Sequence, residues 1–284
     1  VGFLVAGVSA LRWLLGDRGR DVRAMLKTGV ALGALLIPVQ IFMGDMHGLN
    51  TKAYQPAKVA AMEGLWETQA GAPLVLFGIP DETARENRMA VEIPGLASFI
   101  LTHHWDGELT GLNEFVTEDG EVLHPPVAPV FWSFRVMVGT GLAMLLVSWA
   151  AVWFMWRRRA LHEGRIAGHW LAVEGLPRPV LWALVPMALS GWVATLSGWY
   201  TTEIGRQPWL VQGVMTTEMA VAEVPAPMVM GTLLTYLAIY AALLFAYIGV
   251  IVYLSRKAAK GQSGAGDDMI HSGEAEVAAL SPAE

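Results

Sequence analysis

Four long apolar stretches without a charged residue dominate this sequence: residues 28–44, 136–156, 179–202 and 224–255. A helix needs about 20 apolar residues to cross the hydrocarbon core of a bilayer. The composition agrees, because 54% of the residues are hydrophobic, only 15% are charged, and the mean hydropathy is +0.45. These values exclude an ordinary soluble domain and a disordered chain. We therefore predict an all-α integral membrane helix bundle.

A fifth apolar stretch, residues 1–10, meets Arg12 too early to form a complete span. The chain begins with Val inside this stretch, so we expect a helix that is truncated at its N-terminal end. A signal peptide is the alternative, but the basic region and the small-residue cleavage site of such a segment are lacking. The bundle is thus predicted to have four complete transmembrane helices plus a truncated N-terminal one.

The distribution of basic residues predicts the orientation of these helices. Arg and Lys gather in residues 12–27, 157–178 and 256–260, which all fall on one side of the membrane if the spans alternate. Such residues accumulate on the cytoplasmic side, so the C-terminus is predicted to be cytoplasmic. The opposite side carries a long acidic loop, residues 45–130.

The predicted organisation follows from the spans and the charges, in chain order: truncated transmembrane helix 1–16, basic cytoplasmic loop 17–27, transmembrane helix 28–44, outer loop 45–130, transmembrane helix 131–156, basic cytoplasmic loop 157–178, transmembrane helix 179–202, outer loop 203–226, transmembrane helix 227–255 and cytoplasmic tail 256–284. The tail is rich in Gly, Ser, Ala and acidic residues and is predicted to be disordered.

Charge and cysteine content limit the chemistry that this chain can perform. A net charge of -6 does not favour a nucleic-acid partner. The sequence has no cysteine, which excludes disulfides, thiolate metal sites, iron–sulfur clusters and covalently attached haem. Any cofactor must therefore be held by His, Met, Glu or Arg.

The outer loop contains a predicted helix, residues 56–67, with Pro56 in its first turn and apolar residues at helical spacing. Lys58 and Glu63 lie on this helix, about 140° apart, so a direct bridge between them is not expected. A quinol-oxidising site needs a base for the leaving protons and a hydrogen-bonding partner for the ring oxygens, and this pair has the required groups. The segment alone favours a solvated amphipathic helix. Pro125, Pro126 and Pro129 predict an extended return to the membrane.

Trp199, Glu203 and Arg206 lie at the outer end of the third complete span, spaced i, i+4, i+7. They share one face if the helix persists to Arg206, although Pro208 favours a helix end nearby. The carboxylate is a candidate axial haem ligand, and the guanidinium is a candidate partner for a haem propionate. The alternative is an ion pair with aromatic anchors at the lipid boundary, which the spacing alone favours.

Arg135 and Met137 lie near the outer end of the second complete span. An arginine in a membrane helix is costly, which suggests a functional role with a propionate or another anionic partner. A methionine thioether can be a soft axial ligand of haem iron, but a single methionine in a membrane helix is usually a packing residue. At i, i+2 the two side chains point in different directions. Gly139 and Gly141 leave room for a flat macrocycle or for a neighbouring helix.

No histidine lies inside a predicted complete span, so this chain alone does not provide a bis-histidine haem site. Four histidines belong to the outer loop, two to the basic cytoplasmic loop and one to the tail: His47, His103, His104, His124, His162, His169 and His271. No P-loop, dinucleotide-binding, zinc-protease or Ser/His/Asp motif is present in the sequence.

Several short segments together resemble subunit I of the cytochrome bd-type quinol oxidases. They occur in the family's order and on the predicted sides of the helices: residues 44–45 (GD), 58–63 (KVAAME), 66–68 (WET), 76–81 (LFGIPD), 134–137 (FRVM) and 205–209 (GRQPW), the last preceded by Glu203. The resemblance covers nearly the whole chain except the tail and corresponds to the second part of the subunit.

The resemblance implies a role for each matching residue. Met137 would be an axial ligand of a low-spin haem b that Arg135 anchors or tunes. Glu203 would be a ligand at a high-spin haem b, with Trp199 near the haems and Arg206 on propionates. Lys58 and Glu63 would belong to the quinol-oxidising loop.

The family oxidises quinol at the outer face of the bacterial inner membrane and reduces dioxygen to water. The implied partners are subunit II, the missing N-terminal half of subunit I, and membrane lipid. The histidine that would pair with Met137 and the ligand of haem d would precede Val1. The short outer loop resembles the cyanide-insensitive branch, which leaves open whether the third haem is d or b. The alternatives are a di-haem cytochrome b quinone module, which would have paired histidines within its spans, and a transporter or scaffold, which would have inverted repeats or broken helices.

Overall fold

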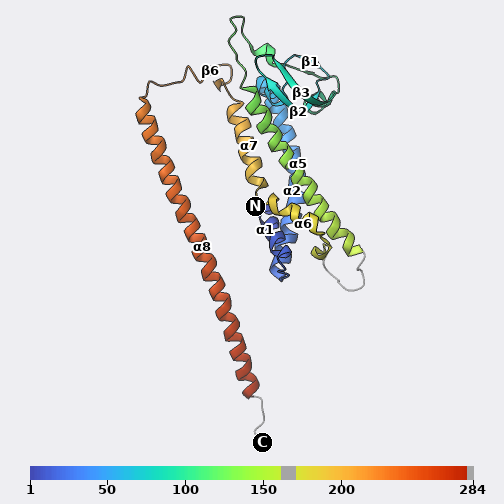
Figure 1. Ribbon diagram of the computed structural model, residues 1–284, viewed down its shortest axis with the longest axis vertical. Helices are drawn as coiled ribbons and strands as arrows, with labels where there is room; N and C mark the ends of the chain where they lie inside the picture. Colours follow the sequence, from blue (N-terminus) through green and yellow to red (C-terminus); the bar gives the residue numbers. More distant parts are fainter. Residues whose placement is uncertain (161–170, 280–284) are drawn as a thin grey trace. The chain divides into compact units, whose positions relative to one another are not determined.

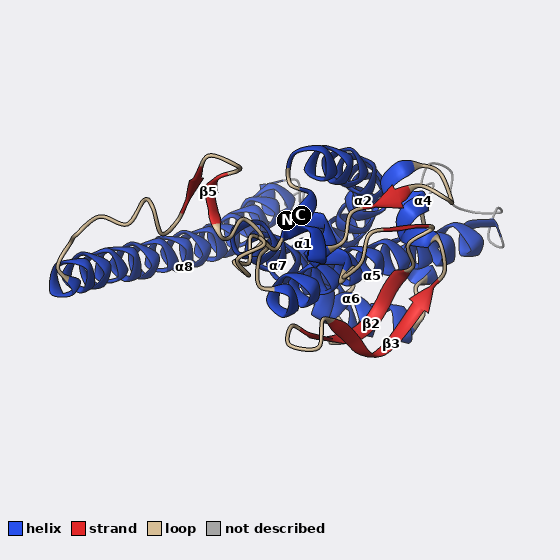
Figure 2. Cartoon of the chain, turned by 90° about the horizontal axis from the view of Figure 1, so that it is seen from above, coloured by secondary structure: helices blue, strands red, loops and turns tan. Residues whose placement is uncertain are grey.

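The computed structural model describes residues 1–160 and 171–279, and the chain divides into two units, Val1–Val221 and Ala222–Glu284. Helices dominate both units (Figures 1 and 2). His162 and His169 lie outside the described residues.

Three of the described helices are long and apolar enough to cross a membrane: α2 (Arg20–Tyr54), α5 (Val127–Ala160) and α8 (Ala226–Ala279). A fourth span forms if α6 (Arg178–Met187) and α7 (Ser190–Ile204) are counted together. The predicted helical membrane fold is confirmed. The N-terminal apolar stretch forms the short helix α1 (Gly2–Leu14).

The predicted third span, residues 179–202, is not one continuous helix. Helices α6 and α7 meet at an angle of 43°. Pro186 explains the break, because proline lacks an N–H group and its ring clashes with the carbonyl one turn earlier. The expectation of an unbroken span at residues 179–202 was therefore wrong.

The helices also extend beyond the apolar stretches that predicted them. Helix α2 continues through Asp45 and His47 to Tyr54, so His47 lies on a candidate membrane helix rather than in a loop. Helix α5 begins at Val127, where an extended segment was expected. Pro129 fits in the first turn because the N–H that it lacks would have no partner in the helix there. The amide of Val127 donates a 2.8 Å hydrogen bond to Glu82 Oε1, which caps α5.

In the second unit, α8 continues to Ala279, whereas the composition of residues 256–284 predicts disorder. Hydropathy indicates which part of a helix can lie within the bilayer, but it does not indicate where the helical backbone hydrogen bonds end. No proline interrupts these hydrogen bonds between Pro227 and Pro282.

Glycines allow α1 to pack closely against its neighbours in the first unit. A Cβ atom on Gly7 would lie 2.7 Å from the carbonyl oxygen of Leu184 in α6, and one on Gly29 would lie 2.7 Å from the carbonyl oxygen of Gly2. The core beneath these contacts joins α1, α2, α5 and α6: Ala6, Ala10, Trp13, Val22, Leu26, Val30, Ala151, Met155, Leu171, Val173, Leu176, Leu181 and Leu184. Close backbone approach of this kind is how helices associate in lipid.

The connection between α2 and α5, residues 55–126, folds into a small layer at one end of these helices (Figure 1). It begins with α3 (Pro56–Glu63), which is shorter than predicted because Gly64 adopts a left-handed conformation, with φ of +68°. The remaining elements are β1 (Gln69–Ala70), β2 (Leu74–Asp81), β3 (Glu86–Ile93), α4 (Leu96–Thr102), β4 (Glu108–Leu109) and a 3-10 turn, Leu112–Phe115.

The strands of this connection were not predicted from the sequence. Strands β2 and β3 form an antiparallel hairpin, with Leu74 opposite Ile93 and Asp81 opposite Glu86, and the hairpin is visible in Figure 2. Strand β1 also pairs with β4 in an antiparallel arrangement. After α7, β5 (Trp209–Val211) and β6 (Met215–Thr216) form a further short hairpin. The irregular spacing of apolar residues in β2 and β3 explains why no strand periodicity was evident.

Candidate functional site

Arg135 joins α5 to the connection between α2 and α5. Its guanidinium donates to the carbonyl oxygens of Val75 (2.9 Å from Nε), Met62 (2.5 Å) and Phe131 (3.2 Å). It also lies over the Phe131 ring, 3.3 Å from the centroid. Within the described chain its acceptors are backbone carbonyls, and the propionate or other anionic partner that the sequence suggests stays a prediction. Arg135 therefore fastens α3 and β2 to the end of α5.

Glu63 lies at the end of α3, next to this arginine. Glu63 is only 6% exposed, and its Oε2 atom has no hydrogen-bond partner among the described residues. Burial raises the pKa of Glu63 to about 7, although the positive charge of Arg135 opposes this shift. A carboxylate with such a pKa exchanges protons near neutral pH. Glu63 lines a small cavity of about 60 Å³ with Lys52, Val59, Leu109 and Thr110 among its other walls.

Lys58 lies on another side of α3 and is also buried, with 8% exposure. Its stem lies against Gly205, since a Cβ atom on that glycine would be 3.0 Å from Lys58 Cγ. Burial lowers the pKa of Lys58, the charge of Arg206 lowers it further, and Glu203 raises it. The described ion pairs include none between Lys58 and Glu63, as the helical spacing predicts. The expected solvated helix is wrong, because α3 is buried along its length.

Glu203 and Arg206 form an ion pair with an N–O distance of 3.1 Å. Helix α7 ends at Ile204, so Arg206 lies beyond the helix and reaches back to the carboxylate. Trp199 and Glu203 share a face of α7, with Trp199 57% exposed and the Glu203 side chain 46% exposed. This face presents an aromatic ring and an accessible carboxylate side by side.

Met137 faces α7 rather than the layer that Arg135 holds. A Cβ atom on Gly198 would lie 2.9 Å from the Met137 sulfur, and one turn away Ser133 Oγ lies 2.9 Å from Thr201 Oγ1. Arg135 and Met137 thus point in different directions, as their spacing predicts. At Gly139 and Gly141 an added Cβ atom would meet nothing within 4 Å in the described chain, so close helix contact does not account for these two glycines there.

The donor types available here suit haem iron, although no described group of three His, Cys, Asp or Glu side chains could hold a bare metal ion. A thioether and a carboxylate are each able to supply one axial donor, and the Glu203 carboxylate is partly exposed. Met137 and Glu203 are thus candidate single ligands, and they lie on different helices, α5 and α7.

Asn87 of β3 is a positioning residue that the sequence did not reveal. Its side-chain amide donates 2.7 Å to the carbonyl oxygen of Gly64, and its Oδ1 atom accepts from the Trp66 ring nitrogen at 3.2 Å. These bonds hold the turn directly after Glu63. Gly64 was the one local signal of this turn, although the predicted helix, residues 56–67, ran through it.

These features define a helical membrane protein in which a folded connection buries two ionisable side chains against the ends of its membrane helices. The family model of cytochrome bd terminal oxidase subunit I matches residues 1–259, and the chain belongs to this family.

Individual relatives agree with this assignment. Cytochrome bd ubiquinol oxidase subunit 1 of Bacillus subtilis is 29% identical, with 78% of this chain and 45% of the relative aligned. Cytochrome bd-II ubiquinol oxidase subunit 1 of Escherichia coli is 28% identical, with 86% and 56% aligned. The solved bd oxidase of Geobacillus thermodenitrificans matches with a TM-score of 0.71 and 28% identity, over 90% of this chain and 54% of that one. The chain spans about half the length of the curated relatives it matches.

Proposed function

We propose that this chain is the quinol-oxidising and haem-ligating part of the catalytic subunit of a bd-type terminal oxidase. The complete enzyme would couple oxidation of two quinols to reduction of one dioxygen to two waters, with four electrons and four protons transferred. The observation that carries the proposal is Glu63, a buried carboxylate with a raised pKa and an unpartnered oxygen on α3. The relatives named as quinol oxidases support it.

Glu63 would accept a proton from the quinol hydroxyl, and Lys58 would hold a ring oxygen. Quinol oxidation requires a base whose pKa lies near the working pH, since such a base is unprotonated often enough and still binds the proton. Arg135 would keep α3 in place through its bonds to the carbonyls of Met62 and Val75.

Three haems would supply electron transfer and oxygen reduction when bound: a low-spin haem b, a high-spin haem b, and a haem d or third haem b. Met137 would ligate the low-spin haem and Glu203 the high-spin one. Trp199 would line the haem face of α7, and Arg206 would exchange its pairing with Glu203 for a propionate. The second ligand of the low-spin haem would come from a residue outside those described.

Subunit II is the proposed protein partner, and the bacterial cell membrane is the proposed location. The distribution of the basic segments supports a cytoplasmic C-terminus and an outer position for residues 55–126.

Glu63→Gln in the complete oxidase tests the proposal. Because the amide cannot take up a proton, steady-state quinol oxidation should fall by about 100-fold while the haem spectra stay unchanged. Glu67→Gln is the matched control, since Glu67 is exposed and only four residues away. Wild-type turnover in Glu63→Gln would remove this residue from the reaction.

A further inference from the structure

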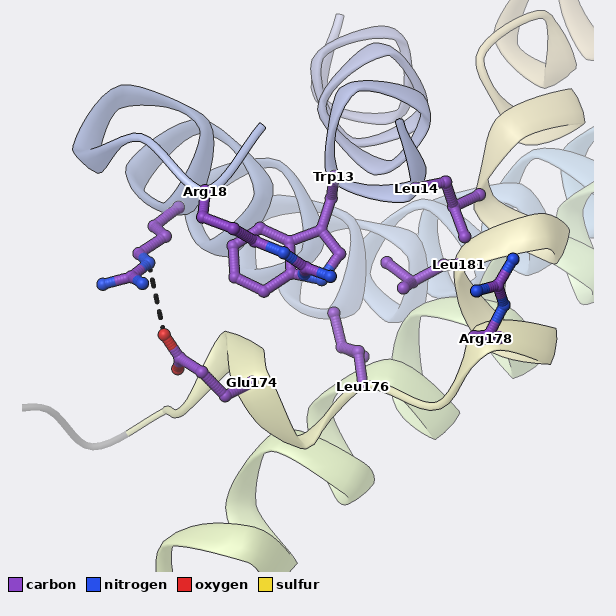
Figure 3. A pocket seen from close by; sticks show the side chains of 8 residues that line it. Trp13, Leu14, Arg18, Glu174, Leu176, Arg178 and Leu181 are labelled. Carbon is purple, nitrogen blue, oxygen red and sulfur yellow. Dashed lines mark ion pairs between the residues drawn. The ribbon is translucent and has the colours of Figure 1, made fainter. Parts of the chain in front are cut away.

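A second cavity lies where the ends of α1, α2 and α6 meet in the first unit, and none of the residues proposed as quinol or haem ligands lines it. Its volume is about 340 Å³ (Figure 3). It is formed by the end of α1, the start of α2, the turn before α6 and the start of α6. All these helices pass from apolar to charged sequence at this point, which is the pattern expected at the boundary between membrane and water.

The cavity has an apolar wall and a basic rim. Trp13, Leu14, Leu176 and Leu181 form the wall, and the remaining lining residues are charged: Arg18, Arg23, Arg178 and Glu174. Three guanidinium groups and one carboxylate give the lining a net positive charge. Combining apolar and cationic surfaces in this way suits a ligand with an anionic head and an apolar body.

Two of the three arginines keep their N–H groups available. Arg23 is engaged, since its Nε lies 3.2 Å from Glu174 Oε1. Arg18 lies over the Trp13 ring, with its guanidinium carbon 3.9 Å from the ring centroid, and Figure 3 shows the two side chains against each other. A cation–π contact with an aromatic ring occupies no conventional hydrogen-bond acceptor, so the N–H donors of this guanidinium stay available. Neither Arg18 nor Arg178 has an acidic partner among the described residues.

We propose that this cavity binds a phosphate group, with Arg18 and Arg178 as the ligating side chains and Trp13 as the platform that orients Arg18. Planar guanidinium groups bind phosphate oxygens with paired hydrogen bonds. Basic pockets between membrane helices on the cytoplasmic side bind the headgroups of anionic lipids. A free inorganic phosphate would satisfy the same donors, so the experiment has one arm for each source.

In the lipid arm, phosphatidylglycerol is titrated onto the delipidated complete oxidase, and the bound lipids are counted by native mass spectrometry. Each arginine near a membrane surface changes lipid affinity by about fivefold, so the double variant Arg18→Gln/Arg178→Gln should bind the tightest lipid roughly thirty-fold more weakly. The control variant Arg20→Gln/Arg157→Gln removes the same charge outside the cavity and should retain wild-type affinity.

In the second arm, inorganic phosphate alone is added, and protection of residues 13–18 from hydrogen exchange is measured. Protection that is lost in the cavity variant and kept in the control identifies free phosphate as a ligand of the same site. Equal behaviour of the two double variants in both arms would overturn the proposal, because the effect would then be one of general charge. Haem spectra show whether each variant assembles. If the double variant does not assemble, Arg178→Gln alone replaces it, with an expected loss of lipid affinity of about fivefold.

Discussion

Lys58 fills the space beside Gly205: a Cβ atom on this glycine would lie 3.0 Å from Cγ and 3.2 Å from Cε of the lysine. The same atom would lie closer still to the carbonyl oxygen of Thr201. The end of α7 and the buried face of α3 are therefore in direct contact. Through this contact, the residues proposed for quinol oxidation adjoin the turn that carries Arg206.

Gly205→Ala should displace Lys58 and strain the end of α7. We expect a loss of about 1–3 kcal/mol in stability, as for overpacking of a buried site, together with slower quinol oxidation. Thermal unfolding and steady-state turnover of the complete oxidase measure both effects. Gly191→Ala is the control within α7, since an added Cβ atom there meets nothing in the described chain. Unchanged stability in Gly205→Ala would contradict the contact.

Glu63 should make both activity and stability depend on pH. Its pKa of about 7 exceeds the ordinary value of 4.5, so its basic form, and with it quinol oxidation, should increase as the pH rises through about 7. Above pH 4.5 the unfolded chain ionises while the folded chain stays protonated. The cost of burying Glu63 therefore grows between pH 4.5 and 7 and then levels off at about 3 kcal/mol.

Glu63→Gln removes this cost, so the variant should be more stable than the wild type at pH 8 and similar to it at pH 4.5. Unfolding midpoints at the two values measure the difference, with Glu67→Gln as the reference. If the unfolding midpoint of Glu63→Gln depends on pH as in the wild type, another group causes the pH dependence.

Arg135→Lys should loosen the connection between α2 and α5 even though the charge is kept. Lysine has a single ammonium group and cannot reach the carbonyls of Val75, Met62 and Phe131 together. We expect a loss of about 2–4 kcal/mol, because buried carbonyl groups lose their partners. Hydrogen exchange should increase in α3 and β2. The exposed Arg88→Lys serves as the control, and equal protection in both variants would exclude this role for Arg135.

Met137→Leu and Glu203→Ala should change different haem signals. Leucine keeps the volume of Met137 against Gly198 but lacks the sulfur, so the low-spin haem spectrum should change with little loss of stability. Glu203→Ala should abolish the high-spin signal. Met144→Leu and Glu218→Ala are controls elsewhere in the chain. Optical spectra that match the wild type in both variants would contradict the ligand assignments.

Local sequence determined the membrane helices and the directions of their side chains. Apolar length predicted the spans because lipid selects for it, and helical spacing placed Arg135 and Met137 on different faces. Local sequence did not determine where the helices end. Hydropathy does not show that the backbone hydrogen bonds of α2 continue to Tyr54. The break at Pro186 follows from its missing N–H group and not from a change in polarity.

The burial of Lys58 and Glu63 was decided only by the tertiary structure. Their segment alone resembles a solvated helix, because its charges look exposed until α2, α5 and the 3-10 turn Leu112–Phe115 pack against it. The carbonyls that bind Arg135 and the amide of Asn87 that holds Gly64 come from residues distant in the chain. A sequence pattern records which groups a residue carries, but desolvation depends on what packs around it, and that is a property of the folded chain.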